Sequence, residues 1–380
     1  MQVSVIYGAC RRHDAISEAV RGTVQAISGR RSWSCRLFAY ACDFSELHSK
    51  TVSGMSDVIL DNYFITSDVI IYHFGIYYEL FNIANIGNGR ARQIVRYHNV
   101  TPKIFMPRDM HALLDRSEEQ KANMLNVERI WADSQFNKND LVQYGIPENR
   151  IEILPLYIKE YYKGFTRGKK ARDVVRILYV GRFVASKGVT DLLRAIALTR
   201  KATSAPFLVD LVGNESFSDP SYIAEVRHLI RSLDIADAVT ISGEVSDADL
   251  RIRLARSHIF AIASYHEGFC VPLLEAMQAK CIPIAYAAGN VPDLVGPFGA
   301  LVEPGDWRSF ADELTRLIAF FAAHNRGKKT AHLPLRTGPA RIEAYDRQLD
   351  KYLQSYTYQA FRQRTISALS SPRQAGREGL

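Results

Sequence analysis

Residues 267–275 read EGFCVPLLE, with two glutamates eight positions apart that enclose a glycine–aromatic pair and a proline. The apolar run at 259–264 comes just before Glu267 and is typical of a buried strand. Pro272 suits the first turn of a helix, because the N–H that proline lacks has no partner there. We therefore expect Glu267 on a strand-to-helix loop and Glu275 about one turn into the helix.

This arrangement suits a ligand that combines an anion with hydroxyl groups. The free N–H groups of a helix N-terminus can bind an anion such as a diphosphate. Glu267 could accept hydrogen bonds from sugar hydroxyls, and Glu275 could do the same for ribose hydroxyls. The alternative is an ordinary loop with two solvated glutamates, and the spacing alone does not separate the two interpretations.

A second strand-to-helix element favours the ligand. The apolar run VRILYV at 175–180 leads into Gly181-Arg182 and Lys187-Gly188, and a helical apolar pattern follows from 189. Gly181 permits a sharp turn, while the planar fork of Arg182 and the point charge of Lys187 both suit phosphate oxygens. The alternative is a pair of solvated surface cations, but the two elements together favour a phosphate site.

These motifs resemble a known family. VGRFVASKGVTDLL (180–193) and EGFCVPLLEA (267–276) resemble the C-terminal half of retaining, nucleotide-sugar-dependent glycosyltransferases of family 4. RYHNVTP at 96–102 resembles a subgroup with a His-Asn-Val/Ile-Thr-Pro signature. The resemblance implies the GT-B fold, which has two facing Rossmann-like domains with parallel sheets and an active site in the interdomain cleft. Further similar segments lie at 131–155, 209–215, 240–250, 288–296 and 301–306.

The chain alternates strand and helix patterns throughout, which predicts an α/β protein with doubly wound parallel sheets. Its 380 residues suit two domains. We expect an acceptor-side domain at 1–157, a linker at 158–173, a nucleotide-sugar domain at 174–338, a helix at 339–364 that crosses back, and a disordered tail at 365–380. The predicted strands lie at 3–7, 69–72, 93–97, 130–132 and 151–154, then at 175–180, 207–212, 239–241, 259–263, 282–285 and 300–302.

The first domain offers candidates at the carboxyl ends of its strands. His98 follows one strand, and the resemblance implies that it approaches the donor near the reacting carbon; alternatively it caps a loop. His73 ends a neighbouring strand and could line the cleft or be structural. Gly8 and Asp14 lie in the first strand-to-helix loop, where the family often places acceptor contacts. Asp14 could also cap the helix that follows.

Composition limits the partners and the location. The net charge of +8 is compatible with an anionic membrane, nucleic acid or an anionic substrate. No nucleic-acid-binding motif is present, whereas a lipid-linked acceptor would suit basic patches at an anionic membrane surface. The sequence shows no transmembrane-length apolar run and no signal segment, and its five cysteines form no CxxC pair. We expect a cytoplasmic protein that contacts the inner face of the membrane.

Two motifs that suggest other chemistry have simpler explanations. Asp247-Ala248-Asp249 resembles a metal-binding Asp-x-Asp motif, but it follows Ser246 and precedes an apolar helical pattern, which indicates a capped helical turn. Gly87-Asn88-Gly89 lacks the third glycine of a dinucleotide-binding loop. We therefore expect no metal and no cofactor.

The sequence predicts a retaining transfer of a hexose from a nucleoside-diphosphate sugar to a lipid-linked or glycan acceptor. Arg182 and Lys187 would neutralise the leaving diphosphate, and Glu267 with the N–H groups of Gly268 and Phe269 would hold the sugar. The resemblance at 96–102 favours mannose in polysaccharide assembly. Front-face attack and double displacement both remain open. The alternatives are an epimerase or phosphorylase of the same fold, or a basic binding protein without catalysis.

Overall fold

The structure is a computed structural model that describes residues 1–12, 14–167, 174–215, 218–326, 332–335 and 341–371. The chain forms two compact units. Unit 1 comprises residues 1–103, 107–157 and 356–380, and unit 2 comprises residues 104–106 and 158–355.

Unit 1 is built on a seven-stranded sheet in the order β5-β3-β1-β6-β7-β8-β9, and every pair of neighbours is parallel. All six residues of the central strand β6 are buried, as expected for a parallel strand covered on both faces. A short parallel pair, β2 (Ala9–Cys10) and β4 (Ala41–Cys42), lies apart from this sheet. The strands of the large sheet are β1 (Gln2–Ile6), β3 (Ser34–Ala39), β5 (Ser49–Thr51), β6 (Val69–Phe74), β7 (Arg92–Tyr97), β8 (Arg129–Ala132) and β9 (Ile151–Ile153).

Polar side chains cap two helices of unit 1, and the sequence suggested one of them, Asp14. Asp14 caps α1 by accepting a hydrogen bond from the Ser17 N–H, and Ser134 caps α5 through the Asn137 N–H. Gly145 ends α5 in the left-handed conformation, with φ of 103°. The helices are α1 (Ala15–Ser28), α2 (Met55–Ile59), α3 (Asn62–Ile65), α4 (His111–Gln120), α5 (Gln135–Tyr144) and α13 (Tyr358–Ser370).

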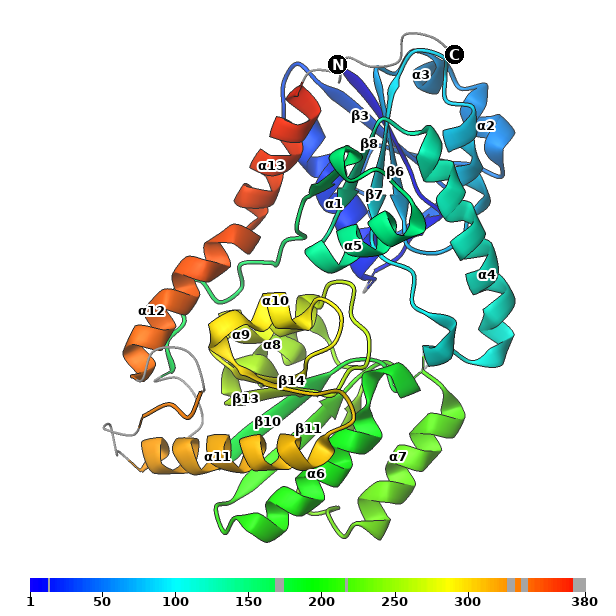
Figure 1. The fold of residues 1–380 in the computed structure, drawn as a ribbon. Helices are drawn as coiled ribbons and strands as arrows, with labels where there is room; N and C mark the ends of the chain where they lie inside the picture. The colour runs from blue at the N-terminus through cyan, green and yellow to red at the C-terminus, as the bar shows by residue number, and fades with distance from the viewer. Residues whose placement is uncertain (13, 168–173, 216–217, 327–331, 336–340, 372–380) are drawn as a thin grey trace. The chain divides into compact units, whose positions relative to one another are not determined.

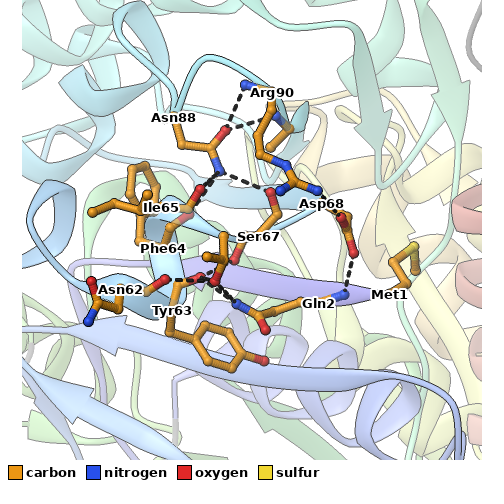
Figure 2. Close-up of polar contacts among 12 residues, drawn as sticks. Met1, Gln2, Asn62, Tyr63, Phe64, Ile65, Ser67, Asp68, Asn88 and Arg90 are labelled. Atoms are coloured by element: carbon orange, nitrogen blue, oxygen red, sulfur yellow. Dashed lines mark hydrogen bonds and ion pairs between the residues drawn. The ribbon is translucent and has the colours of Figure 1, made fainter.

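A polar network near the start of β1 and β6 explains the Gly87-Asn88-Gly89 segment (Figure 2). The Asn88 amide donates hydrogen bonds to the carbonyl oxygens of Phe64, at 2.8 Å, and Ser67, at 2.9 Å. Its side-chain oxygen accepts a hydrogen bond from the Ala91 N–H at 2.8 Å. Gly87 and Gly89 both have positive φ. The segment is a turn that ties the entry of β7 to the end of α3.

Unit 2 contains a six-stranded parallel sheet in the order β12-β11-β10-β13-β14-β15. Figure 1 shows α6, α7 and α11 on one face of this sheet and α8, α9 and α10 on the other. The strands are β10 (Val175–Val180), β11 (Phe207–Val212), β12 (Val239–Gly243), β13 (Ile259–Ile262), β14 (Ile282–Tyr286) and β15 (Ala300–Val302). The helices are α6 (Val189–Ala202), α7 (Pro220–Ser232), α8 (Asp247–Arg256), α9 (Val271–Gln278), α10 (Val291–Val295), α11 (Trp307–Asn325) and α12 (Ile342–Leu353).

Two parallel sheets with helices between their strands confirm the predicted α/β class. The sequence order β1-α1-β3 and β10-α6-β11 gives the crossover units that parallel neighbours require. In a parallel sheet the ligand-binding loops lie at the carboxyl ends of the strands. The loops that carry Lys187 and Glu267 follow β10 and β13, which are direct neighbours in the sheet of unit 2.

The C-terminal segment differs from the expectation. In place of one helix at 339–364 there are two: α12 belongs to unit 2, and α13 lies along α1 in unit 1 (Figure 1). The disordered tail predicted from residue 365 is wrong for its first part, because α13 continues to Ser370. Phe361, Thr365 and Leu369 are buried at intervals of four residues and form the inner face of this helix. Residues 372–380 lie outside the described part.

The predicted linker at 158–173 falls partly outside the description, since residues 168–173 are not described. The described part belongs to unit 2, where Ile158 and Tyr162 are buried. Arg167 forms an ion pair with Asp346 of α12 at 2.9 Å. These contacts fix residues 158–167 onto unit 2, and the predicted domain boundaries otherwise stay a prediction.

Candidate functional site

The loop between β10 and α6 begins at Gly181 and ends at Gly188. Gly188 has φ of 59° and is the N-cap of α6. A Cβ atom at Gly188 would lie 2.0 Å from the carbonyl oxygen of Ala263, so a side chain cannot fit there. Gly181 is also close-packed, because a Cβ atom there would lie 2.7 Å from the Tyr179 hydroxyl. Gly188 thus allows this loop to pass directly against the end of β13.

The loop between β13 and α9 carries Glu267 and is tied to two neighbouring loops. The Tyr265 N–H donates to the Ser186 carbonyl oxygen at 2.8 Å, and the Asn290 N–H donates to the Glu267 carbonyl oxygen at 2.8 Å. A Cβ atom at Gly289 would lie 2.2 Å from that same Glu267 oxygen, which requires glycine in the β14–α10 loop. The backbone at Glu267 is thus fixed from both sides.

Lys187 and Glu267, which are 80 residues apart in sequence, form an ion pair at this edge of unit 2. The Lys187 Nζ atom lies 2.7 Å from Glu267 Oε1, and the two side chains are 19% and 12% exposed. The sequence predicted that both residues contact one ligand, and the structure brings them together. Enough of each side chain remains exposed for a ligand to reach it.

Arg182 is placed differently from Lys187. Its residue is exposed, and its carbonyl oxygen accepts a hydrogen bond from the Tyr179 hydroxyl at 2.9 Å. Within the described part of the chain, the guanidinium has no hydrogen-bond or ion-pair partner. Tyr179 fixes the backbone of Arg182, so the cationic side chain projects from a defined point beside the Lys187 loop.

The helix that follows Glu267 begins as expected. Pro272 lies in the first turn of α9, and Glu275 lies one turn further along. Gly268, Phe269 and Glu275 are all half-buried. The sequence-predicted donor residues therefore share the β10–α6 loop, the β13–α9 loop and the first turns of α9.

In unit 1, the predicted residues His73 and His98 belong to a buried chain of hydrogen bonds. His98 Nδ1 lies 2.6 Å from Asp133 Oδ2, and His98 Nε2 lies 2.9 Å from His73 Nδ1. Arg96 donates to the other Asp133 oxygen at 3.0 Å. The carboxyl ends of β6, β7 and β8 supply these residues, because parallel strands place their ends at one edge.

Burial disfavours the protonated form of His73. The pKa of His73 is held well below its ordinary value by desolvation, with further contributions from His98 and Arg96. The His98 side chain is only 2% exposed, and both of its ring nitrogens have partners. The structure therefore shows His98 held in place by Asp133 and His73, and its predicted role near the reacting carbon stays a prediction.

Sequence reasoning missed Asp133 and Arg96. Asp133 directly follows β8, in the segment WADSQ, and could have been found as a charged residue at the carboxyl end of a predicted strand. Arg96 could not, because an arginine inside an apolar strand gives no indication of its partner. Its side chain is fully buried, and its NH2 group also donates to the Leu154 carbonyl oxygen at 2.7 Å.

The acceptor-side candidates Gly8 and Asp14 lie in the loop after β1. The predicted capping role of Asp14 is confirmed: its carboxylate accepts hydrogen bonds from the Ser17 N–H at 2.8 Å and the Ser17 hydroxyl at 2.6 Å. The Gly8 carbonyl oxygen accepts a hydrogen bond from the Tyr40 N–H at 2.8 Å, which joins this loop to the end of β3. An acceptor contact at either residue stays a prediction.

The other motifs have the structural roles that the sequence suggested. Ser246 caps α8 through the Asp249 N–H, so Asp247-Ala248-Asp249 forms the first turn of a helix. Across the described ranges, no three His, Cys, Asp or Glu side chains are grouped as a metal ion would require. None of the helices described is both long enough and apolar enough to cross a membrane.

Comparisons with known proteins place this geometry in context. Residues 165–330 match the family described as glycosyl transferases group 1. The chain is 29% identical over 205 residues to the MMP alpha-(1->4)-mannosyltransferase of Mycolicibacterium hassiacum, covering 53% of this chain and 47% of that protein. It is 22% identical to the O-antigen chain mannosyltransferase B of Escherichia coli, covering 57% and 58% of the two chains. The chain thus spans about half the length of the curated relatives it matches.

Solved structures share the fold over almost the whole chain. The lipopolysaccharide outer core galactosyltransferase WaaB superposes with a TM-score of 0.71 at 16% identity, covering 97% of this chain and 99% of that one. Anabaena Alr3699/HepE in complex with UDP superposes with a TM-score of 0.72 at 14% identity, covering 98% and 100%. The GT-B fold predicted from the sequence is confirmed by these neighbours.

Proposed function

We propose that this chain, whose residues 165–330 match the group 1 glycosyl transferases, moves a hexose from a nucleoside-diphosphate sugar to a hydroxyl group of a lipid-linked or glycan acceptor. The observation that carries the proposal is the Lys187–Glu267 ion pair at the carboxyl edge of the sheet in unit 2. A nucleoside-diphosphate sugar has a phosphate half and a sugar half. The ion pair places a cation that can bind the phosphate beside a carboxylate that can hold sugar hydroxyls.

The cations serve the leaving group. An ammonium has three N–H donors, so Lys187 can keep its bond to Glu267 and still donate to diphosphate oxygens. Arg182 adds a planar fork of donors. As the bond between sugar and phosphate breaks, negative charge grows on the diphosphate, and these two side chains stabilise it without prior rearrangement. The N-terminus of α9 adds a partial positive charge.

The carboxylates serve the sugar and the ribose. Glu267, with the N–H groups of Gly268 and Phe269, holds hydroxyls of the transferred hexose. Glu275, one turn into α9, holds the ribose hydroxyls. Lys187 donates a hydrogen bond to Glu267 Oε1 at 2.7 Å, and a carboxylate whose charge is stabilised in this way is a weaker nucleophile. This favours a retaining reaction in which the acceptor attacks on the leaving-group face and the departing phosphate takes its proton.

The sugar is assigned as mannose or a related hexose. Two relatives described above are named mannosyltransferases, and a 129-residue stretch is 30% identical to the GDP-mannose:cellobiosyl-diphosphopolyprenol alpha-mannosyltransferase of Komagataeibacter xylinus. That stretch covers 34% of this chain and 30% of that protein. The UDP-bound neighbour makes a UDP-sugar the alternative.

Thermal stabilisation by free nucleotides tests the donor. GDP, UDP and ADP are added separately to the chain, and the midpoint of unfolding is compared. A nucleotide at 100 times its dissociation constant should stabilise the native state by about 2.7 kcal/mol. We expect GDP to stabilise the protein most. A larger effect of UDP reassigns the sugar donor, and the absence of any effect contradicts the proposed function.

The positive net charge supports a lipid-linked acceptor and a location at an anionic membrane. A net charge of +8 favours contact with an anionic membrane, where lipid-linked sugars are found. We propose that the chain works in the cytoplasm at the inner face of the membrane. Sedimentation with anionic and with zwitterionic vesicles tests this. Binding should require the anionic lipid and should weaken as ionic strength rises, because salt screens surface charge.

A further inference from the structure

Three side chains converge on the carboxylate of Asp191 in α6, close to the donor loop. The Tyr265 hydroxyl donates to Asp191 Oδ2 at 2.5 Å, and the Tyr286 hydroxyl donates to the same oxygen at 3.0 Å. Arg194 donates to Oδ1 at 2.9 Å. Asp191 is only 6% exposed, so these donors replace the water that a carboxylate would otherwise bind.

The two tyrosines belong to different parts of unit 2. Tyr286 is the last residue of β14 and is buried in the core. Tyr265 is half-buried and lies two residues before Glu267 on the β13–α9 loop. Burial, reinforced by the hydrogen bond to Asp191, raises the pKa of Tyr265 to about 12. Its hydroxyl therefore remains protonated, and remains a donor, at neutral pH.

The hydroxyl of Tyr265 ties the β13–α9 loop to helix α6. The loop backbone is held by Ser186 on one side and Asn290 on the other. The bond from Tyr265 to Asp191 adds an attachment to α6, and it is charge-assisted, which makes it stronger than a bond between neutral groups. Glu267 therefore extends from a loop that is fixed at three places before any ligand arrives.

We propose that Tyr265 is a positioning residue for the sugar half of the donor. Its hydrogen bond to Asp191 holds the β13–α9 loop so that Glu267 and the N–H groups of Gly268 and Phe269 face the hexose. This inference rests on the proposed function. When the tie is lost, the loop spends less time in the binding conformation, and the apparent affinity for the donor falls by that fraction.

The shared carboxylate provides a matched control. Tyr265→Phe and Tyr286→Phe each remove one hydroxyl from the same Asp191 oxygen and keep the aromatic ring. Only Tyr265 belongs to the Glu267 loop. If Tyr265 only stabilises the fold, the two substitutions should change the donor KM to a similar extent. If Tyr265 positions the Glu267 loop, only Tyr265→Phe should raise the donor KM.

The first readout is donor kinetics. Nucleoside diphosphate release is measured with GDP-mannose and with UDP-glucose, for the full chain and both variants. In Tyr265→Phe, we expect the donor KM to rise about tenfold, as for the loss of one charge-assisted hydrogen bond, with kcat changed less than about twofold. The dissociation constant of the free nucleoside diphosphate should not change, because Lys187, Arg182 and Glu275 are untouched. Tyr286→Phe should leave the donor KM as in the wild type.

The second readout does not depend on any donor. Hydrogen exchange of the amides at 264–270 should be faster in Tyr265→Phe than in the wild type or Tyr286→Phe. Equal exchange in all three proteins overturns the tie itself. Faster exchange with an unaltered donor KM overturns the positioning role and leaves the proposed function intact. If the wild type releases neither nucleotide, the proposed function fails and this inference fails with it.

Discussion

The ammonium of Lys187 lies 2.7 Å from the carboxylate of Glu267, at the edge where β10 and β13 end side by side. Without a ligand, each residue neutralises the other in a half-buried setting. An incoming diphosphate must share or displace the carboxylate at Lys187. Glu267 therefore orients the ammonium of Lys187 before the donor binds.

Removal of either cation should slow turnover. We expect Lys187→Ala and Arg182→Ala each to lower kcat by about a hundredfold or more, as losses of leaving-group stabilisation do. Lys187→Arg should not fully restore activity, because a planar fork does not replace a point charge 2.7 Å from Glu267. The measurement is steady-state nucleotide release. Near-normal rates in both alanine variants would mean that these residues are ordinary surface cations.

Substitution of the two glutamates should change different kinetic constants. Glu275, assigned to the ribose, makes contacts throughout the reaction, so Glu275→Gln should mainly raise the donor KM. Glu267, assigned to the transferred sugar, should matter more as charge develops, so Glu267→Gln should lower kcat strongly. Paired kinetic profiles of the two variants test this. Equal losses of kcat in both would indicate one shared structural role, and the sugar chemistry would then be sought first at His98.

Donor binding should need no divalent metal. Lys187, Arg182 and the N-terminus of α9 supply the positive field that a metal ion provides in other phosphate sites. Turnover in the presence of excess chelator should equal turnover without it. Activity that disappears with chelator and returns with manganese would rule this out.

The buried His73 should make stability depend on pH. Its folded-state pKa lies well below the unfolded value of about 6.5, so below that pH the unfolded chain binds a proton that the native state rejects. Above about pH 6.5 His73 should therefore not lower the free energy of unfolding. Below that pH the free energy of unfolding should fall by up to about 1.4 kcal/mol per pH unit because of this group.

His73→Gln removes this linkage, whatever its effect on overall stability. Urea denaturation at several pH values should give a shallower loss of unfolding free energy between about pH 6.5 and 5 than in the wild type. The same substitution at the exposed His228 controls for the removal of an imidazole. Parallel slopes in His73→Gln and the wild type would show that His73 titrates normally in the native protein.

Much of unit 2 could be predicted from the sequence, because its strands are short and mostly apolar runs. The predicted bounds 175–180 and 207–212 match β10 and β11, and Glu267, Pro272 and Glu275 fall on the predicted loop and helix. In unit 1, β3 was missed. Its sequence, SCRLFA, begins with two polar residues out of three, and its place in the sheet is shown by its parallel pairing with β1 and β5.

The site was predicted as a set of residues rather than as a set of contacts. Motif spacing placed Lys187 and Glu267 on loops that follow predicted strands. The ion pair forms because β10 and β13 are neighbours in the sheet, which motif spacing does not reveal. The contact of His98 with Asp133 was missed for the same reason, since Asp133 lies 35 residues away, directly after the neighbouring strand β8. Tertiary pairing between distant segments supplies this information, and local pattern does not.

Calorimetric titration of a free nucleoside diphosphate tests the central claim most directly. The nucleotide that best stabilises the wild type is titrated, with chelator present, into the wild type, Glu267→Gln and Lys187→Ala. Because the negative charge of Glu267 repels a diphosphate bound beside it, we predict that Glu267→Gln binds at least as tightly as the wild type. Lys187→Ala should bind about tenfold or more weakly. Equal affinity of Lys187→Ala and the wild type would contradict the account, because Lys187 would then not contact the diphosphate.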